Sequence, residues 1–413
     1  MNVSAAAGRL RFLLIDDDPD VRALVAALLG VAGHLTEECD RPSEGLRRAI
    51  AEPPDCVILD LILPEMSGIE LCERLRAEPA LANTKIVVLS AKPYGQDRDK
   101  ARQVGADAYL VKPVNVQTFV PTINELVREQ VELRFWGVRG TLPLPGPGSV
   151  RYGGNTACLS LSFAGGRMLI FDAGSGIYRL GQSLISSARE LQLHLLISHL
   201  HLDHISALPT FAPLYQSGVH LDIYGPGESD AELQRGVFTL MEGAYWPVSA
   251  HALAANVSCH ALEPGENHID GIRVRTLLLR HPGSCLGYRV EYRGRALCYI
   301  TDNELTPLGH PSHDPHYLQT LAKFVRGCEL LVTDTTYSDR EYPKHVGWGH
   351  SPVSEVARLV QTAEVKRWYL FHHDPSQDDE AIDRKLEEAR VALEELGSSA
   401  ECEAPVEGTS TLL

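Results

Sequence analysis

Short apolar runs alternate with helical patterns over roughly the first 128 residues. Four of these runs predict buried strands, namely RFLLI, CVILDL, KIVVLS and DAYLV. Apolar residues share one face of the segment after the first run, and Pro19 and Gly33 mark the start and the end of this predicted helix. Because strands that alternate with helices form parallel sheets covered on both faces, this part is predicted to be α/β, with a doubly wound parallel sheet.

The pattern changes near residue 130. From VELRFWG onward, short apolar segments are separated by Gly and Pro, and helical patterns occur near 230–241, 354–364 and 379–396. Such a mixture indicates two packed sheets flanked by helices. We expect one domain over 1–128 and a second over 132–413, joined by a short linker. Only His34 of the 17 histidines precedes the linker, so any imidazole chemistry belongs to the second domain.

The composition excludes several classes of protein. The chain has 413 residues, of which 44% are hydrophobic, and no apolar stretch reaches the roughly 18 to 20 residues that span a bilayer. Its nine cysteines form no CxxC pair, which disfavours a disulfide framework or a structural zinc ribbon. The net charge of −16, without a long Lys/Arg run, argues against stable nucleic-acid binding. We expect a cytoplasmic protein that does not contact a membrane.

Charged and polar side chains gather where the first predicted strands end. Asp16 and Asp17 follow the first strand, Asp60 follows the second of the apolar runs, and Ser90 and Lys112 follow the next two. Ligands of open parallel sheets bind at this edge, and carboxylates brought together there repel one another unless a hard cation such as Mg²⁺ joins them. A simpler role for Asp16, Asp17 and Asp18 is to cap the next helix.

The motifs IDDDPDVR, CVILDLILPEMSGIEL, VVLSAK and GADAYLVKPV together resemble the receiver domain of two-component response regulators, across about residues 8–128. The resemblance implies a flavodoxin-like fold, phosphorylation of Asp60 by a sensor histidine kinase, and a homodimer. It also implies Mg²⁺ ligands and switch residues, which are Asp16, Asp17 and Asp60 for the ion and Ser90, Tyr109 and Lys112 for the switch. The alternative for Tyr109 is a half-buried strand aromatic that never moves.

The strongest chemical signal is HxHxDH, at residues 199–204, directly after the apolar run LHLLIS. His199 and His201 alternate beyond the predicted strand, and Asp203 and His204 continue the turn. One histidine at a strand end is more often hydrogen-bonded filler, but four ligating side chains in six residues can converge on one small volume. Imidazole and carboxylate together suit two adjacent ions of Zn, Mn or Fe.

HxHxDH after a strand is similar to the metallo-β-lactamase superfamily, and the resemblance extends over about 132–402. It implies an αββα sandwich whose further ligands close later strands, at His281, Asp302 and His372. By the family pattern, one metal ion is held by His199, His201 and His281, the other by Asp203, His204 and His372, and Asp302 bridges them.

Two further residues, His373 and Asp172, each allow two interpretations. His373 adjoins His372, and the strand register favours His372 as the ligand. Asp172, in LIFDAG, matches the family's buried aspartate that orients a ligand histidine, although a turn cap would explain it as well.

Two loops carry cationic and polar residues suited to phosphate oxygens. Residues 134–156 supply Arg139 and Asn155, and residues 333–352 supply Lys344, His345 and His350. This arrangement resembles the phosphodiesterase branch of the superfamily, in which a histidine of a GHS-like segment acts at the leaving group, and His350 matches it. Two simpler roles stay open, since GWGHSP could cap the next helix and Arg139 could be a surface charge.

These observations predict a two-component response regulator whose output is a dimetal phosphodiesterase, with Asp203 and His350 as candidate catalytic residues. Two adjacent cations activate water and neutralise oxyanions, which favours hydrolysis. Because the chain has no long basic insertion for grasping tRNA, a small or cyclic nucleotide is the expected substrate. An acyl or lactone hydrolase is the second hypothesis, and a signalling or binding module with a structural metal site is the third.

Overall fold

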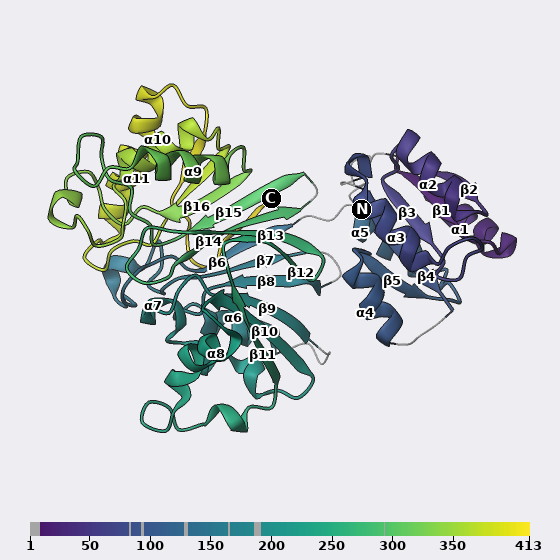
Figure 1. The fold of residues 1–413 in the computed structure, drawn as a ribbon, viewed down its shortest axis with the longest axis horizontal. Helices are drawn as coiled ribbons and strands as arrows, with labels where there is room; N and C mark the ends of the chain where they lie inside the picture. Colours follow the sequence, from purple (N-terminus) through teal and green to yellow (C-terminus); the bar gives the residue numbers. More distant parts are fainter. Residues whose placement is uncertain are drawn as a thin grey trace. The chain divides into compact units, whose positions relative to one another are not determined.

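The computed structural model describes residues 9–81, 84–91, 95–127, 131–163, 166–185, 191–292 and 294–413. The chain forms two compact units (Figure 1). The first comprises Met1–Gln130 and His268–Ile272, and the second comprises Val131–Asn267 and Arg273–Leu413. The expected domains of 1–128 and 132–413 include residues 1–8 and 128, which lie outside the described residues. Among the described residues, no helix is both long enough and apolar enough to cross a membrane.

The first unit is an α/β fold built on one five-stranded sheet. The strand order is β2-β1-β3-β4-β5, and every pairing is parallel. The chain alternates strands and helices: β1 (Arg11–Ile15), α1 (Pro19–Val31), β2 (Leu35–Cys39), α2 (Pro42–Ala51), β3 (Cys56–Leu59), α3 (Gly68–Ala77), β4 (Lys85–Ser90), α4 (Gly95–Gln103), β5 (Ala108–Val111) and α5 (Phe119–Val127). This is the doubly wound parallel sheet that the alternating pattern predicts.

The buried strands of this sheet explain the near-continuous apolar runs in the sequence. All four residues of β3 and all six of β4 are buried, because helices cover both faces of the sheet. Leu13, Val57 and Val88 belong to one core with Leu71 and Leu75 of α3. The core fixes the carboxyl ends of β1, β3, β4 and β5, where the predicted receiver residues lie.

The second unit contains two seven-stranded sheets. The first has the order β11-β10-β9-β8-β7-β6-β19, with β6 (Glu132–Gly137), β7 (Cys158–Ser162), β8 (Met168–Phe171), β9 (Leu191–Leu196), β10 (Val219–Pro226), β11 (Asn256–Leu262) and β19 (Ser410–Leu412). The second has the order β12-β13-β14-β15-β16-β17-β18, with β12 (Gly265–Ile269), β13 (Ile272–Leu278), β14 (Leu286–Tyr292), β15 (Arg295–Ile300), β16 (Leu330–Asp334), β17 (Arg367–Phe371) and β18 (Glu401–Glu403).

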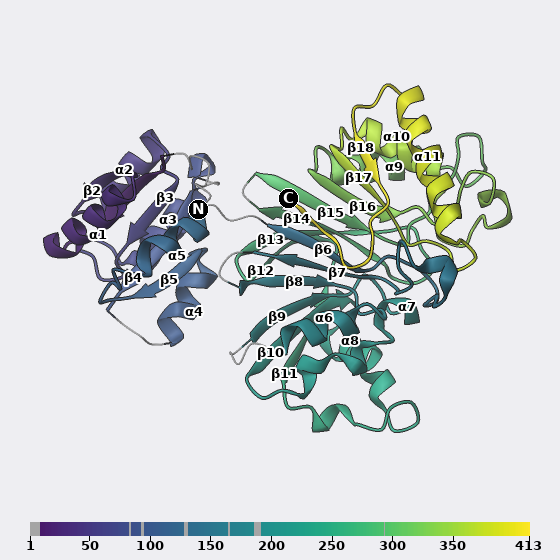
Figure 2. The same cartoon turned by 180° about the vertical axis from the view of Figure 1, so that it is seen from behind.

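Helices cover the outer face of each sheet, as Figures 1 and 2 show from opposite sides. The first sheet carries α6 (Ile177–Leu184) and α8 (Asp230–Phe238), and the second carries α9 (Pro315–Val325), α10 (Val353–Thr362) and α11 (Asp379–Glu395). The short helix α7 (Leu202–Ile205) follows β9. These layers form the αββα sandwich that the sequence predicts.

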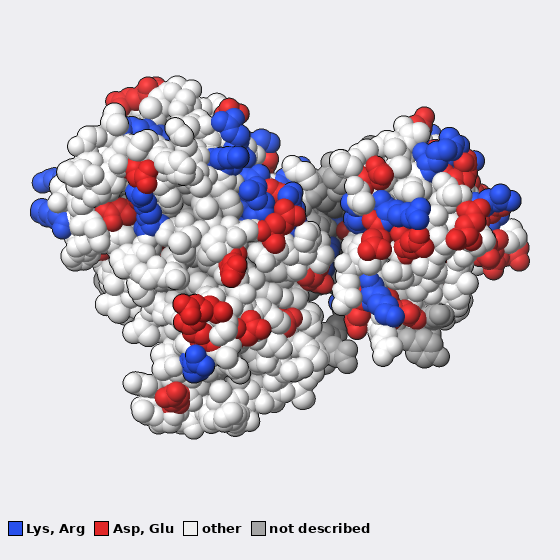
Figure 3. All heavy atoms as spheres, in the orientation of Figure 1, with Lys and Arg blue, Asp and Glu red and all other residues white. Residues whose placement is uncertain are grey.

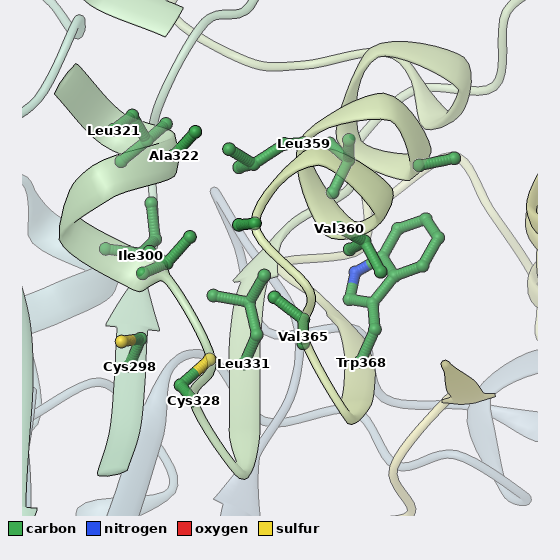
Figure 4. Packing of buried hydrophobic residues seen from close by; sticks show 14 of the residues in the cluster. Cys298, Ile300, Leu321, Ala322, Cys328, Leu331, Leu359, Val360, Val365 and Trp368 are labelled. Atoms are coloured by element: carbon green, nitrogen blue, oxygen red, sulfur yellow. The ribbon is translucent and has the colours of Figure 1, made fainter. Parts of the chain in front are cut away.

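The apolar core beneath the second sheet's helices is drawn in Figure 4. Leu321 of α9 and Leu359 of α10 lie over Ile300, Leu331 and Trp368, which come from β15, β16 and β17. A matching core lies between α6, α8 and the first sheet. Dense packing of this kind resists small displacements, so the ends of β9, β15, β16 and β17 present their following residues at fixed positions.

Charged side chains of both signs lie on the face of the protein that Figure 3 draws. On the face drawn in Figure 3, Lys and Arg lie among Asp and Glu on both units.

Candidate metal centre and receiver site

The HxHxDH segment changes from extended backbone to helix within six residues. β9 ends at Leu196, and His201 occupies the N-cap position of α7 in an extended conformation, with φ −66° and ψ 152°. His199 and His201 therefore precede the helix, and its first turn carries Asp203 and His204. This local geometry turns all four side chains toward one region.

The first group of potential ligands contains His199, His201, His281 and Asp302, whose ligating atoms all lie within 4.8 Å of one another. Nε2 of His281 is 3.1 Å from Nδ1 of His201. Oδ2 of Asp302 is 3.7 Å from Nε2 of both His199 and His281.

The second group contains Asp203, His204, His372 and again Asp302, within the same 4.8 Å limit. Nε2 of His372 is 3.1 Å from Oδ2 of Asp203 and 3.3 Å from Nε2 of His204. Oδ1 of Asp302 is 3.2 Å from Nε2 of both His204 and His372. One oxygen of Asp302 thus faces each group, which is the arrangement that a bridging carboxylate requires.

The chemistry of these donors fits a pair of divalent transition-metal ions. Nε2 of His199 is buried and has no hydrogen-bond partner among the described residues, although a buried polar atom is normally paired. Burial, reinforced by the neighbouring His204, lowers the pKa of His199 well below its usual range, so this imidazole is neutral, as a ligand must be. Burial raises the pKa of Asp302, but the charges of His372 and His204 overcome it and lower that pKa well below its usual range.

Three of the histidines are oriented by hydrogen bonds at Nδ1, which leave Nε2 facing the groups. His204 Nδ1 is 2.7 Å from Oδ2 of Asp172, His281 Nδ1 is 3.0 Å from the Gly349 carbonyl, and His372 Nδ1 is 3.1 Å from Oγ1 of Thr336. Such partners hold a ligand's ring orientation and raise its basicity. Asp172 is fully buried and also accepts from the Ser198 backbone and from the Tyr299 hydroxyl, both at 2.7 Å.

The structure separates the adjacent histidines at the end of β17. His372 adopts φ +62°, and its ring enters the second ligand group. His373 is fully buried elsewhere, and neither of its ring nitrogens has a hydrogen-bond partner among the described residues. Gly140 is required here because a Cβ at this position would lie 2.1 Å from the His372 ring.

His350 lies beside the second group and pairs with a residue that the sequence motifs do not single out. Its Nδ1 is 2.7 Å from Oδ2 of Asp334, and its ring stacks on His372 with centroids 5.0 Å apart. Burial lowers the pKa of His350, but the Asp334 charge and hydrogen bond raise it to about 9. Asp334 is the last residue of LLVTD, just as Asp302 is the last residue of LCYITD. This position at a strand end is the sequence feature by which Asp334 could have been identified.

His350 does not cap the following helix. The N-cap residue of α10 is Pro352, and no side chain caps that helix by a hydrogen bond.

Arg139 is not the surface charge that the alternative describes, and its role in substrate binding stays a prediction. Its guanidinium is fully buried and donates to the carbonyls of Gly153 and Gln377, so it holds loops together. Asn155 is also engaged at both ends of its amide, by Glu407 and by the Ser175 hydroxyl. Both side chains thus have partners within the protein, although Asn155 also lines a cavity of about 430 Å³.

The second loop presents a lysine to solvent. Lys344 is exposed, whereas His345 is half-buried and stacks on Tyr337 with centroids 4.2 Å apart. The His345 Nδ1 lies 3.0 Å from the Glu341 carbonyl. A cavity of about 330 Å³ adjoins His281 on the side of this loop, and Arg280, Pro282, Glu304, Thr306, Ser312, Val346 and two glycines line it with His281.

In the first unit, the predicted receiver residues converge at the carboxyl edge of the sheet. The Lys112 ammonium lies 2.8 Å from Oδ2 of Asp16 and 2.8 Å from Oδ2 of Asp60. Ligating oxygens of Asp16, Asp17 and Asp60 lie within 4.8 Å of one another. Burial raises the pKa of Asp16, although Lys112 opposes this. Of the three consecutive aspartates at positions 16–18, Asp18 caps the helix, because its side chain accepts from the first backbone N–H groups of α1.

The other two predicted switch residues, Ser90 and Tyr109, lie on the neighbouring strands β4 and β5. Ser90 is the last residue of β4 and is fully buried, and Tyr109 is half-buried in β5 with the Arg98 guanidinium 6.0 Å from its ring centroid.

Two family models match the chain. The response regulator receiver domain matches residues 12–124, and the beta-lactamase superfamily domain matches residues 167–373. Among curated proteins, the DNA-binding dual master transcriptional regulator RpaA of Synechocystis sp. is 35% identical over 118 residues. This match covers 29% of the present chain and 49% of RpaA, so the chain spans only about half the length of that relative.

Two solved structures resemble the second unit. The metallo-beta-lactamase fold protein YhfI from Bacillus subtilis has 18% identity and a TM-score of 0.51, with 69% of this chain and 100% of that chain covered. Yeast PDE1 has 17% identity and a TM-score of 0.52, with coverage of 69% and 99%. At these identities the likeness shows the fold alone. With the family matches, it establishes that this chain belongs to the metallo-β-lactamase superfamily and carries a response regulator receiver domain.

Proposed function

We propose that the chain is a response regulator whose output domain is a dimetal phosphodiesterase for a small or cyclic nucleotide. The observation that carries this proposal is the Asp334–His350 pair beside the two ligand groups. An alkyl phosphodiester releases a strongly basic alkoxide, which needs a proton as it departs. A histidine whose pKa is raised to about 9 stays protonated near neutral pH and can supply that proton.

Seven side chains would hold the two ions. His199, His201 and His281 would bind one, Asp203, His204 and His372 the other, and Asp302 would face both. When bound, two divalent ions make hydroxide available from water near neutral pH and stabilise charge on phosphoryl oxygens. The donor set accepts Zn, Mn or Fe, and Mg²⁺ suits the carboxylates of the receiver.

The protein's own groups would orient the reaction. Oδ2 of Asp203 accepts from the Thr141 backbone N–H at 2.6 Å, and this bond fixes the carboxylate where it can ligate and orient attacking water. His350 donates Nδ1–H to Asp334, so its Nε2–H is the proton available to the leaving oxygen. Lys344 is exposed and remains a candidate contact for a phosphate oxygen, and the cavity beside His281 offers room for the rest of a nucleotide.

The test is turnover by protein loaded with Zn, Mn or Fe. We expect hydrolysis of bis(p-nitrophenyl) phosphate and of at least one cyclic nucleotide, and loss of both activities in His199→Ala and Asp203→Ala. Faster hydrolysis of a lactone or a thioester than of any phosphodiester would instead support an acyl hydrolase. A fully loaded protein that hydrolyses none of these compounds would contradict the proposal and favour a signalling module with a structural metal site.

We further propose that a sensor histidine kinase phosphorylates Asp60, and that a receiver homodimer transmits this event to the hydrolase. The pairing of Lys112 with both Asp16 and Asp60 supports the assignment, because a phosphoryl group on Asp60 would compete for the same ammonium. Treatment with acetyl phosphate and Mg²⁺ is expected to change both the oligomeric state and the rate of phosphodiester hydrolysis. Identical values before and after confirmed phosphorylation would contradict the regulatory proposal alone.

A further inference from the structure

The segment 345–351 carries His350 but has no regular secondary structure of its own. It connects the short helix η8 (Tyr342–Lys344) to α10, and both Gly347 and Gly349 adopt φ +86°. A segment of this kind needs specific anchors if it is to hold a side chain at a fixed place.

A single carboxylate holds the backbone of this segment at two positions. Glu304 follows Asp302 by two residues on the loop after β15. Its Oε1 accepts from the Gly347 backbone N–H at 2.7 Å and from the Tyr342 hydroxyl at 2.8 Å, and its Oε2 accepts from the Gly349 N–H at 2.9 Å. Gly347 and Gly349 flank Trp348, so Glu304 fixes the backbone directly before His350.

Gly349 links this anchor to the metal centre. Its carbonyl accepts from Nδ1 of His281 at 3.0 Å, while its N–H is held by Glu304. The approach is close, because a Cβ at Gly349 would lie 2.3 Å from that same Nδ1. Displacement of Gly349 would therefore turn the His281 ring and shift His350, the next residue.

We propose that Glu304 is a positioning residue that acts through Gly349 on two functional groups at once, the His281 ligand and the His350 proton donor. Its carboxylate oxygens are occupied by Tyr342, Gly347 and Gly349, so the role is distinct from ligation. This inference rests on the proposed function for the roles of His281 and His350. Its alternative is that Glu304 stabilises the fold without influencing the metal centre.

The test compares E304Q with Y342F. Glutamine keeps one acceptor oxygen and replaces the other with an NH₂ group, which would face a backbone N–H and leave one of the two glycine N–H groups without an acceptor. Y342F removes the third hydrogen bond but leaves both glycine contacts in place. The affinity for the more weakly held Zn²⁺ is measured by competition with a chromogenic chelator. We expect this affinity to be about 10-fold lower in E304Q than in the parent protein, and unchanged in Y342F.

A second readout addresses His350. p-Nitrophenolate leaves with little need of a proton, whereas an alkoxide must be protonated as it departs. E304Q is therefore expected to lose more activity on a cyclic nucleotide than on bis(p-nitrophenyl) phosphate. Unchanged Zn²⁺ affinity in folded E304Q, with equal losses on both substrates, would overturn the inference.

The chelator measurement needs no substrate, so it distinguishes this inference from the proposed function. If the protein hydrolyses no phosphodiester, the proposed function is contradicted. The Zn²⁺ affinities of E304Q and Y342F would still test the role of Glu304. Should E304Q not fold, Gly349→Ala tests the same link against Gly347→Ala. Both positions have φ +86°, but a Cβ at Gly347 meets nothing within 4 Å. Weaker Zn²⁺ binding confined to Gly349→Ala supports the inference, and equal binding by the two variants overturns it.

Discussion

Replacement of Asp334 by Asn tests the proposed proton donor most sharply. The Asp334 carboxylate lies 2.7 Å from His350 Nδ1 and raises the histidine pKa from 6.5 to about 9, against the opposing effect of burial. Without Asp334 the largest contributions that raise this pKa are gone, so the pKa of His350 falls. A return to the ordinary value of 6.5 would lower the protonated fraction of His350 at pH 8 by about 30-fold.

The sign of the pH effect follows from the role. A proton donor is active below its pKa, so the parent enzyme should keep its rate through neutral pH and lose it on the alkaline side. D334N should lose its rate at a lower pH. The assay is the pH dependence of kcat for a cyclic nucleotide with saturating metal. Asp334 also accepts from the Thr336 backbone, so thermal unfolding must first show that D334N is folded.

Bis(p-nitrophenyl) phosphate is the matched control, since its leaving group needs little protonation. Alkaline limbs at the same pH in D334N and the parent enzyme would refute the assignment of His350 as the proton donor.

Three further predictions concern other parts of the chain. Asp60→Asn should abolish labelling by acetyl phosphate and leave metal content unchanged, measured by phosphate-affinity electrophoresis and elemental analysis; persistent labelling would point to another phosphoacceptor. Trp368→Ala should lower the free energy of unfolding by about 3 to 5 kcal/mol, because the side chain is fully buried. Urea denaturation measures this change, and a loss below about 1 kcal/mol would contradict the packing described. His204→Ala should weaken metal binding without changing phosphorylation of Asp60, and a calorimetric titration with Zn²⁺ that matches the parent protein would exclude it as a ligand.

The fold was largely predictable because the apolar pattern reports burial directly. Strands such as KIVVLS are buried on both faces, and the structure has them in a parallel sheet covered by helices. The seven predicted ligands also come together, because each follows a strand end or lies in the turn after β9, and strand ends meet at one edge of a sheet.

What the sequence could not provide was the direction in which loop side chains point. Arg139 has the charge expected of a phosphate contact, yet its guanidinium is buried against backbone carbonyls. Glu304 carries no motif at all, and its role depends on a loop more than 40 residues away, at Gly347 and Gly349. Long-range hydrogen bonds of this type leave no periodic signal in a single sequence.

Elemental analysis of the purified protein is the most direct test of the account. Seven side chains arranged in two groups around Asp302 predict two equivalents of Zn, Mn or Fe per chain, with at least one equivalent lost in His199→Ala. A parent protein that retains no transition metal after gel filtration, and takes none up when Zn²⁺ or Mn²⁺ is added, would contradict it.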